Sequence, residues 1–289
     1  MELKIREQSD IFLKFVISDA APSFVNTLRR VLVANVPKMA IEDVEFHLGP
    51  IRDNTGKEFE SISPLFDEMI AHRLGLIPIP TDLKIFQNRD ECECKGEGCP
   101  NCTIMYTLNK KGPCTVYSGD LEPLGDVKFR IKDDLIPIVK LGENQALLIY
   151  ATAELGTGKK HAKWQPTSGV GYKYYPELNI DQKRCDNSGA CIDICPRNIF
   201  TKKDKKVVIQ DNFEDCILCN SCVEVCNPKT GGKKKDESKP AVTVMGNENK
   251  FIFKLETDGS IQAKEAFEYA LTFLEEKFND FRDKVSNMK

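Results

Sequence analysis

The sequence predicts an α+β protein whose two chain ends pair in one sheet and enclose inserted material. Two strand-like runs at the N-terminus, LKIREQ and IFLKFVIS, share their pattern with two runs near the C-terminus, AVTVMG and KFIFKLETDG. Helical spacing of apolar residues occupies residues 21–37 and the stretch from about Ser260. With 289 residues, 41% of them hydrophobic, the chain is long enough for two or three domains.

The first predicted helix covers residues 21–37, APSFVNTLRRVLVANVP. Pro22 suits a first helical position and Pro37 ends the helix. One face is apolar, and it comprises Phe24, Val25, Leu28, Val31 and Leu32. The opposite face carries Asn26, Arg29 and Arg30. We therefore expect one face to be buried and the other to be polar.

A second helix is predicted from Ser63-Pro64 to Gly75, with Asp67 and Glu68 near its start and a basic last turn, as the helix dipole favours. The runs AIEDVEFHL and VKFRIKD alternate as strands do. The last helix spaces its large apolar residues by three or four positions: Phe267, Leu271, Leu274, Phe278 and Phe281. That face either docks a partner or packs on the protein's own sheet.

Composition narrows the class of protein. No run approaches the roughly 18 apolar residues of a membrane span, and the N-terminal MELKIREQSD lacks the apolar core of a secretory signal. We therefore expect a cytoplasmic protein without membrane contact. A net charge of -3 provides no global basic field, so direct nucleic-acid recognition is not expected. Because disulfides are rare in the cytoplasm, the 12 cysteines are interpreted as metal ligands.

Four cysteines fall within the short stretch CECKGEGCPNC: Cys92, Cys94, Cys99 and Cys102. Gly96, Gly98 and Pro100 between them suit a loop that wraps one ion, so a structural four-cysteine Zn²⁺ site is predicted. The alternative is a loop of reduced cysteines without metal. Cys114 stands apart and is interpreted as a small apolar residue.

A second group ends in CILCNSCVEVCNP, which has the C-x2-C-x2-C-x3-C-P spacing of bacterial-type ferredoxins. In such runs the fourth cysteine ligates the other cluster of a pair. Cys216, Cys219 and Cys222 should therefore be completed by Cys195, which also precedes a proline. These four thiolates form a full [4Fe-4S] ligand set.

The companion run is incomplete, because Ser188 stands where its second cysteine would be. Only Cys185, Cys191 and Cys226 remain for a second cluster. Three thiolates can hold a [3Fe-4S] cluster, a [4Fe-4S] cluster with a serine or solvent ligand, or nothing stable, and an oxidised pair is a further alternative. Apolar residues around these cysteines suffice for a small ferredoxin-like α+β module, and the polar run KTGGKKKDESKP after it is interpreted as an exposed connector.

No catalytic residues are predicted. GTGKK lacks the G-x4-G-K-[ST] spacing of a phosphate loop, because Ala153 and Lys160 occupy the outer positions. The three histidines, His47, His72 and His161, form no H-E-x-x-H or triad-like group. Acidic residues are scattered instead of clustered as a two-metal nucleotidyl-transfer site requires.

Three separated runs carry a resemblance: NTLRRVLVANVPKMAIEDVEF, ISPLFDEMIAHRLGLIPI and LGTGKKHAKWQPTSGVGYKYYP. In this order they resemble the family of D subunits of archaeal DNA-directed RNA polymerases, which is related to the bacterial alpha amino-terminal domain and to the eukaryotic third-largest subunit. The resemblance covers nearly the whole chain. The zinc cysteines are similar in kind to those of eukaryotic relatives, with different spacing.

The resemblance implies a dimerisation domain at residues 1–47 plus 241–289, an inserted domain at 48–174 and a ferredoxin-like domain at 175–234. It also implies a non-catalytic assembly subunit of a nucleotidyltransferase complex, heterodimerising with the small subunit L and nucleating assembly of the large catalytic subunits. The cluster would stabilise or regulate its domain. On that analogy the subunit contacts are Phe24, Leu28, Arg29, Arg30, His161, Trp164, Phe267, Leu271, Leu274 and Phe278.

Two other function classes compete with this interpretation. A ferredoxin-type electron-transfer subunit of an oxidoreductase would explain the cluster motif, but no flavin or nicotinamide fingerprint accompanies it. A free-standing nucleic-acid-binding zinc protein conflicts with the acidic balance of the chain.

Overall fold

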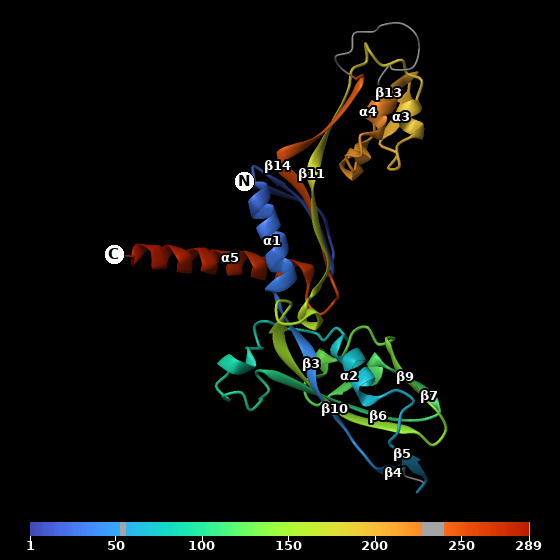
Figure 1. The fold of residues 1–289 in the computed structure, drawn as a ribbon, viewed down its shortest axis with the longest axis vertical. Coiled ribbons are helices and arrows are strands. Elements are labelled where there is room, and N and C mark those ends of the chain that lie inside the picture. The colour runs from blue at the N-terminus through green and yellow to red at the C-terminus, as the bar shows by residue number, and fades with distance from the viewer. Residues whose placement is uncertain (53–55, 227–239, 289) are drawn as a thin grey trace. The chain divides into compact units, whose positions relative to one another are not determined.

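The computed structural model describes residues 1–52, 56–226 and 240–288 (Figure 1). All of the predicted connector KTGGKKKDESKP except Pro240 lies outside the described residues. The chain divides into two compact units, each made of several segments. Unit 1 comprises 1–6, 14–26 and 171–254, and unit 2 comprises 7–13, 27–170 and 255–289. The mixture of sheets and helices confirms the α+β class.

The two chain ends share a four-stranded sheet of order β1-β2-β14-β11. Its strands are β1 (Glu2–Gln8), β2 (Phe12–Ser18), β14 (Val242–Thr257) and β11 (Thr167–Ile180). The predicted pairing of N- and C-terminal strands is thus confirmed. The two C-terminal runs form one strand, β14, which passes close to Tyr174 of β11 at Gly246. A Cβ added at Gly246 would lie 2.7 Å from that of Tyr174.

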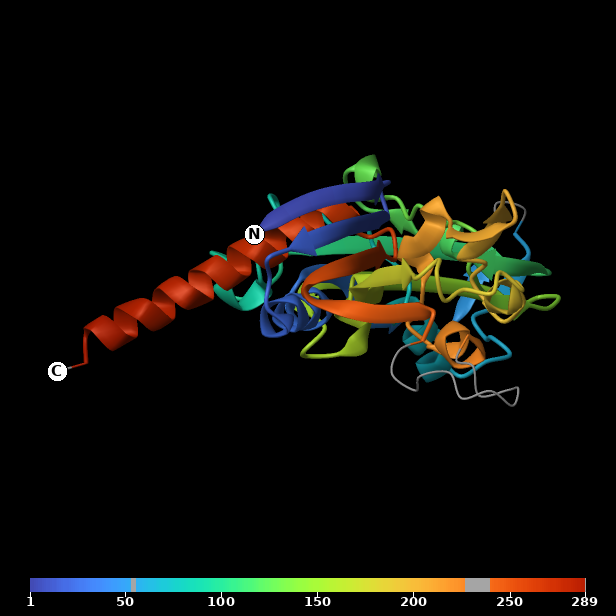
Figure 2. The ribbon, with the colours of Figure 1, turned by 90° about the horizontal axis from the view of Figure 1, so that it is seen from above.

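Aromatic rings fill one side of this sheet within unit 1. Phe15 stacks on Phe253 with ring centroids 5.1 Å apart, and Phe251 contacts Tyr172 and Tyr174 at 5.8 and 5.2 Å. Figure 2 shows the strands of this sheet from above. Phe251 and Phe253 of β14 are fully buried, and so is Ile252 between them. The alternation predicted for KFIFKLETDG therefore appears only from Phe253 to Thr257.

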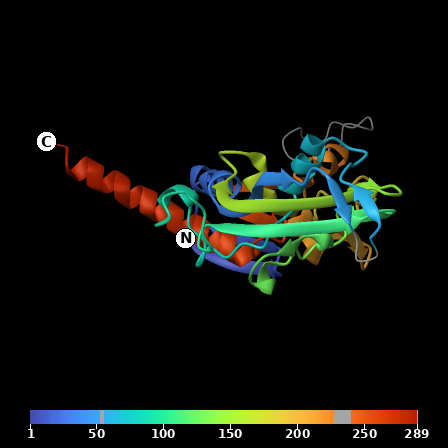
Figure 3. The same ribbon diagram turned by 90° about the horizontal axis from the view of Figure 1, so that it is seen from below.

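A second four-stranded sheet has the order β3-β10-β6-β8 and lies in unit 2 (Figure 3). Its strands are β3 (Pro37–Phe46), β10 (Ala146–Thr157), β6 (Thr103–Lys111) and β8 (Glu122–Pro123). Strand β10 pairs antiparallel with both β3 and β6, and the β3 register shifts between Thr152 and Ala153. Helix α2 (Asp67–Gly75) adds Ile70 and Leu74 to the apolar core of this sheet.

Two sequence predictions in this unit are wrong in detail. Helix α2 begins at Asp67 instead of Ser63-Pro64, because Phe66 is extended and residues 63–66 form a separate turn in which the Ser63 hydroxyl donates to the Leu65 carbonyl. The run VKFRIKD forms no strand. Its first residues make a short 3-10 turn, η3 (Val127–Phe129), because the Asp126 carboxylate caps the Lys128 N–H.

Three two-stranded antiparallel sheets complete the strands. They are β4 (Pro50–Arg52) with β5 (Glu58–Glu60), β7 (Cys114–Tyr117) with β9 (Pro137–Leu141), and β12 (Phe200–Lys203) with β13 (Lys206–Ile209). The other 3-10 turns are η1 (Arg89–Glu91), η2 (Ser118–Asp120), η4 (Ala162–Trp164) and η5 (Asp211–Asp215). Short helices α3 (Ala190–Asp193) and α4 (Ser221–Val225) carry cysteines of the predicted ferredoxin-like module.

Two longer helices match their predictions closely. Helix α1 spans Pro22–Ala34, and its last carbonyl accepts the Lys159 N–H at 2.9 Å. Helix α5 spans Ala263–Ser286, and its buried residues are all in its first half. In Figures 1 to 3 its second half has no other element of unit 2 alongside it. No helix in the described residues is long and apolar enough to cross a membrane.

Candidate metal centres and subunit contacts

The four cysteines of the 92–102 loop converge on one point. Their sulfur atoms all lie within 4.8 Å of one another. Three pairs are closer, with Sγ–Sγ distances of 3.5 Å for Cys92–Cys99, 3.6 Å for Cys94–Cys102 and 3.8 Å for Cys99–Cys102. A tetrahedron of thiolates about 2.3 Å from Zn²⁺ has edges of about 3.8 Å. The arrangement therefore fits a single tetrahedral ion.

Backbone geometry shapes this loop around the sulfurs. Lys95, Gly96 and Gly98 have positive φ values of 55°, 88° and 96°. Such left-handed residues turn backbone N–H groups inward, and the Gly98 N–H lowers the pKa of Cys94 to about 6. Burial instead raises the pKa of Cys102 to about 12. A cation at the centre would stabilise the thiolate form of both.

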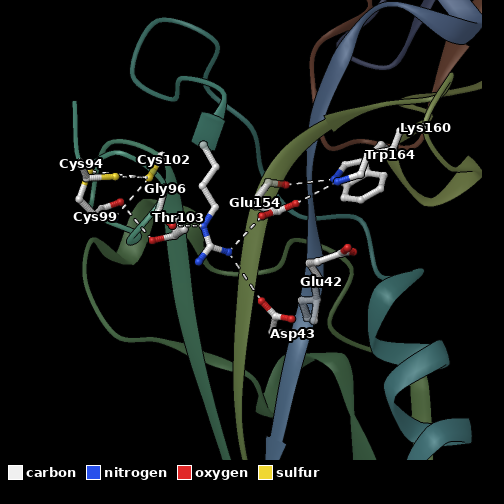
Figure 4. A network of polar contacts seen from close by, with 12 residues as sticks. Glu42, Asp43, Cys94, Gly96, Cys99, Cys102, Thr103, Glu154, Lys160 and Trp164 are labelled. Carbon is white, nitrogen blue, oxygen red and sulfur yellow. Dashed lines mark hydrogen bonds and ion pairs between the residues drawn. The ribbon is translucent and has the colours of Figure 1, made fainter. Parts of the chain in front are cut away.

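A polar network joins this loop to the β3-β10 sheet (Figure 4). Arg89, on the turn before the loop, donates from Nε to the Gly96 carbonyl at 2.9 Å and from Nη1 to Glu154 Oε2 at 3.3 Å. The same Nη1 lies 3.7 Å from Asp43 Oδ2. Lys160 pairs with the other oxygen of Glu154 at 3.3 Å. One guanidinium thus connects the cysteine loop to strands β3 and β10.

Trp164 lies at the far end of this network and is almost fully buried. Its indole N–H donates to the Glu154 carbonyl at 3.1 Å. The Lys160 and Lys163 ammonium groups lie 4.5 and 4.4 Å from the ring centroid. Strand β10 approaches the ring so closely that only Gly156 fits beneath it. The ring therefore packs inside this chain.

The four cysteines assigned to the [4Fe-4S] cluster line one pocket in unit 1. Cys195, Cys216, Cys219 and Cys222 share it with apolar side chains, including Ile199, Phe200 and Val244. Backbone N–H groups point at two of the sulfurs, with the Ile199 N–H 3.5 Å from Cys195 Sγ and the Leu218 N–H 3.5 Å from Cys216 Sγ. Such N–H···S bonds tune iron–sulfur clusters. The pocket and its donors fit the predicted cluster.

Local conformation and burial shape the predicted ligand run. Leu218 and Asn220 have positive φ values of 58° and 62°, which bend the chain so that Cys216, Cys219 and Cys222 face the same pocket. Burial raises the pKa of Cys222 to about 11, so its thiolate needs the charge of bound iron. The Ser221 N–H lowers the pKa of Cys219, the most exposed ligand.

The three remaining cysteines of the module also come together. Burial raises the pKa of Cys191, and a hydrogen bond from Cys226 opposes that rise. Burial, followed by the charge of Cys191, raises the pKa of Cys226 to about 12. Cys185 packs against the same apolar cluster. Ser188 is exposed, and its hydroxyl accepts a long hydrogen bond of 3.5 Å from the Ala190 N–H, so it already has a local role at the start of α3.

The residues predicted to contact other subunits differ in burial. On α1, Leu28 is buried, Phe24 and Arg29 are half-buried, and Arg30 is exposed. On α5, Leu274 is buried, Phe267 is half-buried, and Leu271 and Phe278 are exposed. His161 is exposed, and its Nδ1 accepts the Lys163 N–H at 3.1 Å. Cys114, interpreted as a small buried apolar residue, is only half-buried, although it packs against the unit 2 core.

Sequence reasoning missed Arg89 and Glu154. Glu154 is a charged residue in an otherwise apolar strand, ATAELG, which is a usable signal because a buried carboxylate requires a partner. Arg89 gives no such signal, since its partner lies 65 residues away in the sequence. Only the folded chain shows that the two meet.

Two parts of this chain match known protein-domain families. The RNA polymerase Rpb3/RpoA insert domain matches residues 52–171, and a 4Fe-4S dicluster domain matches residues 177–227. The fold is therefore that of an RNA polymerase alpha-type subunit carrying an iron–sulfur domain.

Full-length relatives narrow the class further. The DNA-directed RNA polymerase subunit Rpo3 of Picrophilus torridus is 43% identical over 98% of this chain and 99% of its own length. The Rpo3 subunit of Thermoplasma volcanium is 42% identical over 99% of this chain and 100% of its own length. That of Archaeoglobus fulgidus is 38% identical over 100% of this chain and 99% of its own length. This chain belongs to the archaeal Rpo3 family, and it is an RNA polymerase subunit that assembles with others.

Proposed function

We propose that this chain is the non-catalytic scaffold of its RNA polymerase, pairing with the small subunit L and thereby nucleating assembly of the large catalytic subunits. The observation that carries the proposal is the second half of α5. Phe278 and Phe281 are 63% and 66% exposed, and Val285 is 48% exposed. A helix face with large exposed apolar side chains at this spacing fits a partner helix.

We also propose the metal content of the subunit. Cys195, Cys216, Cys219 and Cys222 hold a [4Fe-4S] cluster, whose function is to stabilise a module with little apolar core of its own. Cys92, Cys94, Cys99 and Cys102 hold a structural Zn²⁺ ion. A second cluster at Cys185, Cys191 and Cys226 has three thiolate ligands, and the match to a dicluster domain favours it.

The alternative function is electron transfer by the cluster. An electron carrier would be reduced and reoxidised as a partner enzyme turns over, whereas a scaffold is found at fixed stoichiometry in a large complex. The flanking sequence belongs to the polymerase family over nearly its whole length, which favours the scaffold.

Anaerobic purification of the tagged chain from its native host tests the proposal. Mass spectrometry should find subunit L and the large polymerase subunits at near-equal stoichiometry, and metal analysis should find zinc and iron. Recovery of redox enzymes in their place would contradict the scaffold function and support the electron carrier.

A further inference from the structure

The segment that leads into the cluster ligand Cys216 is attached to three strands of the terminal sheet. We call residues 213–216 the anchor segment; it is formed by the end of η5 and the cysteine that follows. All contacts described below lie within unit 1.

Three consecutive residues of the anchor segment each meet a cation from a different strand. Glu214 pairs with Arg6 of β1 through two bonds, Nη2 to Oε1 at 2.5 Å and Nε to Oε2 at 3.2 Å. Asp215 lies 3.7 Å from the ammonium of Lys14 on β2. The Cys216 carbonyl accepts a hydrogen bond from Lys173 of β11 at 2.9 Å.

These contacts are stronger than scattered surface ion pairs. The Arg6–Glu214 pair is bidentate, and the two side chains are 29% and 15% exposed, so solvent screens it only in part. Lys173 is half-buried. Phe213 adds an edge-to-face contact with Tyr175 of β11, with ring centroids 5.9 Å apart.

The cluster loop itself also touches this sheet. The Leu218 side chain would lie 3.2 Å from a Cβ added at Gly246 of β14, so strand and loop are in close contact there. Leu218 is one of the residues held at positive φ between the ligands Cys216 and Cys219. The conformation that the cluster requires is therefore the one that places Leu218 against β14.

From this geometry we infer that the anchor segment couples cluster binding to the order of strands β1 and β2. Cys216 is fixed when it ligates iron, and Asp215 and Glu214, one and two residues away, are then held in position to pair with Lys14 and Arg6. Without the cluster the segment loses its fixed end, and the two N-terminal strands lose these partners. The inference rests on the proposed cluster at Cys195, Cys216, Cys219 and Cys222.

Hydrogen–deuterium exchange on the full-length chain tests the coupling. The chain is compared with and without the cluster, reconstituted anaerobically from iron and sulfide. In the wild type, cluster loading should slow exchange of peptides covering residues 2–18 by roughly fivefold, because a bidentate charged pair contributes on the order of 1 kcal/mol. The variant E214Q/D215N should keep the visible absorbance of the cluster but lose this slowing.

Two further variants make the test specific. R6M/K14M removes the cations on the strand side of the same pairs, so it should lose the slowing of exchange as E214Q/D215N does. The quadruple variant should lose no more of this slowing than either double variant. E177Q is the matched control, because Glu177 lies on β11 and bonds Asn247 at 2.7 Å without contacting the anchor segment. It should retain the full effect.

The failures of the two proposals can be told apart. If cluster loading slows exchange equally in the wild type and in E214Q/D215N, the anchor segment does not couple the two, although the cluster is present. If the wild-type chain takes up no cluster absorbance, the ligand assignment itself is wrong and the coupling falls with it.

Discussion

At the scale of single residues, Gly156 and Trp164 show how tightly side chains determine the unit 2 packing. A Cβ at Gly156 would lie 2.4 Å from the Trp164 ring, which is held by its N–H bond to Glu154 and covered by two lysines. Because the ring cannot move away without breaking these contacts, the position accepts only glycine.

We therefore predict that Gly156→Ala destabilises the chain by about 1–3 kcal/mol, the usual cost of overpacking. Urea denaturation followed by tryptophan fluorescence measures it directly, since Trp164 is the one tryptophan in the sequence. Gly171→Ala is the matched control, because a Cβ there meets nothing within 4 Å. Equal stability of both variants would show that β10 and the ring separate freely.

Tyr106 provides a pH-dependent test at the same scale. Its hydroxyl is buried and donates to the Phe129 carbonyl at 2.7 Å, and burial raises its pKa above the ordinary value of 10.0. The unfolded chain ionises at pH about 10 while the folded chain stays protonated. The stabilisation is therefore complete below pH 10 and is lost as pH rises toward the folded pKa.

Tyr106→Phe should cost about 1 kcal/mol at pH 8, the net contribution of one hydrogen bond. The stability difference between wild type and variant should shrink when urea unfolding is repeated at pH 11. Tyr150 is an exposed ring on the neighbouring strand. Tyr150→Phe is therefore the control, and it should change the stability at neither pH 8 nor pH 11. A wild-type–variant difference that is constant between pH 8 and pH 11 would contradict the assignment.

At the scale of elements, the two halves of helix α5 differ in burial. Its first half buries Ala263, Ala266, Ala270 and Leu274, whereas Phe278 and Phe281 in the second half are exposed. Periodicity predicted a stripe of large residues, Phe267, Leu271, Leu274, Phe278 and Phe281, and left open whether that stripe packs or docks. Of this stripe only Leu274 is buried, and the rest of the buried face consists of alanines that the prediction did not include. The structure shows that the first half packs, and the second half is proposed to dock.

This division predicts opposite effects of matched substitutions. Leu274→Ser should destabilise the chain by about 2–4 kcal/mol, because it removes a buried apolar side chain. Phe278→Ser with Phe281→Ser should leave the melting temperature of the isolated chain unchanged but weaken binding of subunit L roughly tenfold or more, as truncated interface anchors do. Calorimetry and titration with subunit L measure the two effects. Undiminished binding by the double variant would place the interface elsewhere.

The predictions that failed at this scale failed for local reasons. VKFRIKD alternates as a strand does, but the Asp126 side chain caps a 3-10 turn at its start. Helix α2 begins three residues after the predicted Pro64, because Phe66 is extended and the Ser63 hydroxyl bonds the Leu65 carbonyl before it. In both cases a local side-chain hydrogen bond stabilised a conformation other than the strand or helix that the sequence pattern predicted.

At the scale of the whole molecule, the two proposed metal centres belong to different units. The four-cysteine loop proposed to bind zinc lies in unit 2 and is joined to the sheet of that unit by Arg89, whereas the cysteines proposed to hold the cluster lie in unit 1. Because no proposed ligand set draws cysteines from both units, the two centres should form independently.

Cys92→Ser should therefore release zinc and leave the iron content at the wild-type level. Cys216→Ser should lower the iron content and leave zinc at the wild-type level. Metal analysis of the purified chains, made anaerobically, measures both. Loss of both metals in either variant would mean that the units fold as one cooperative block, contrary to this prediction.

The amino-acid sequence by itself determined the family, the α+β class, the spacing of the cluster ligands and the two long helices. These features depend on residues close together in the chain, where periodicity and cysteine spacing act directly. The three-domain division and the roles of the subunit-contact residues stay predictions. Only the tertiary structure decided that Arg6 meets Glu214 across 208 residues, that Arg89 meets Glu154 across 65, and that Trp164 is buried. Such pairs form because folding brings distant strands together, and no local pattern in the sequence encodes that proximity.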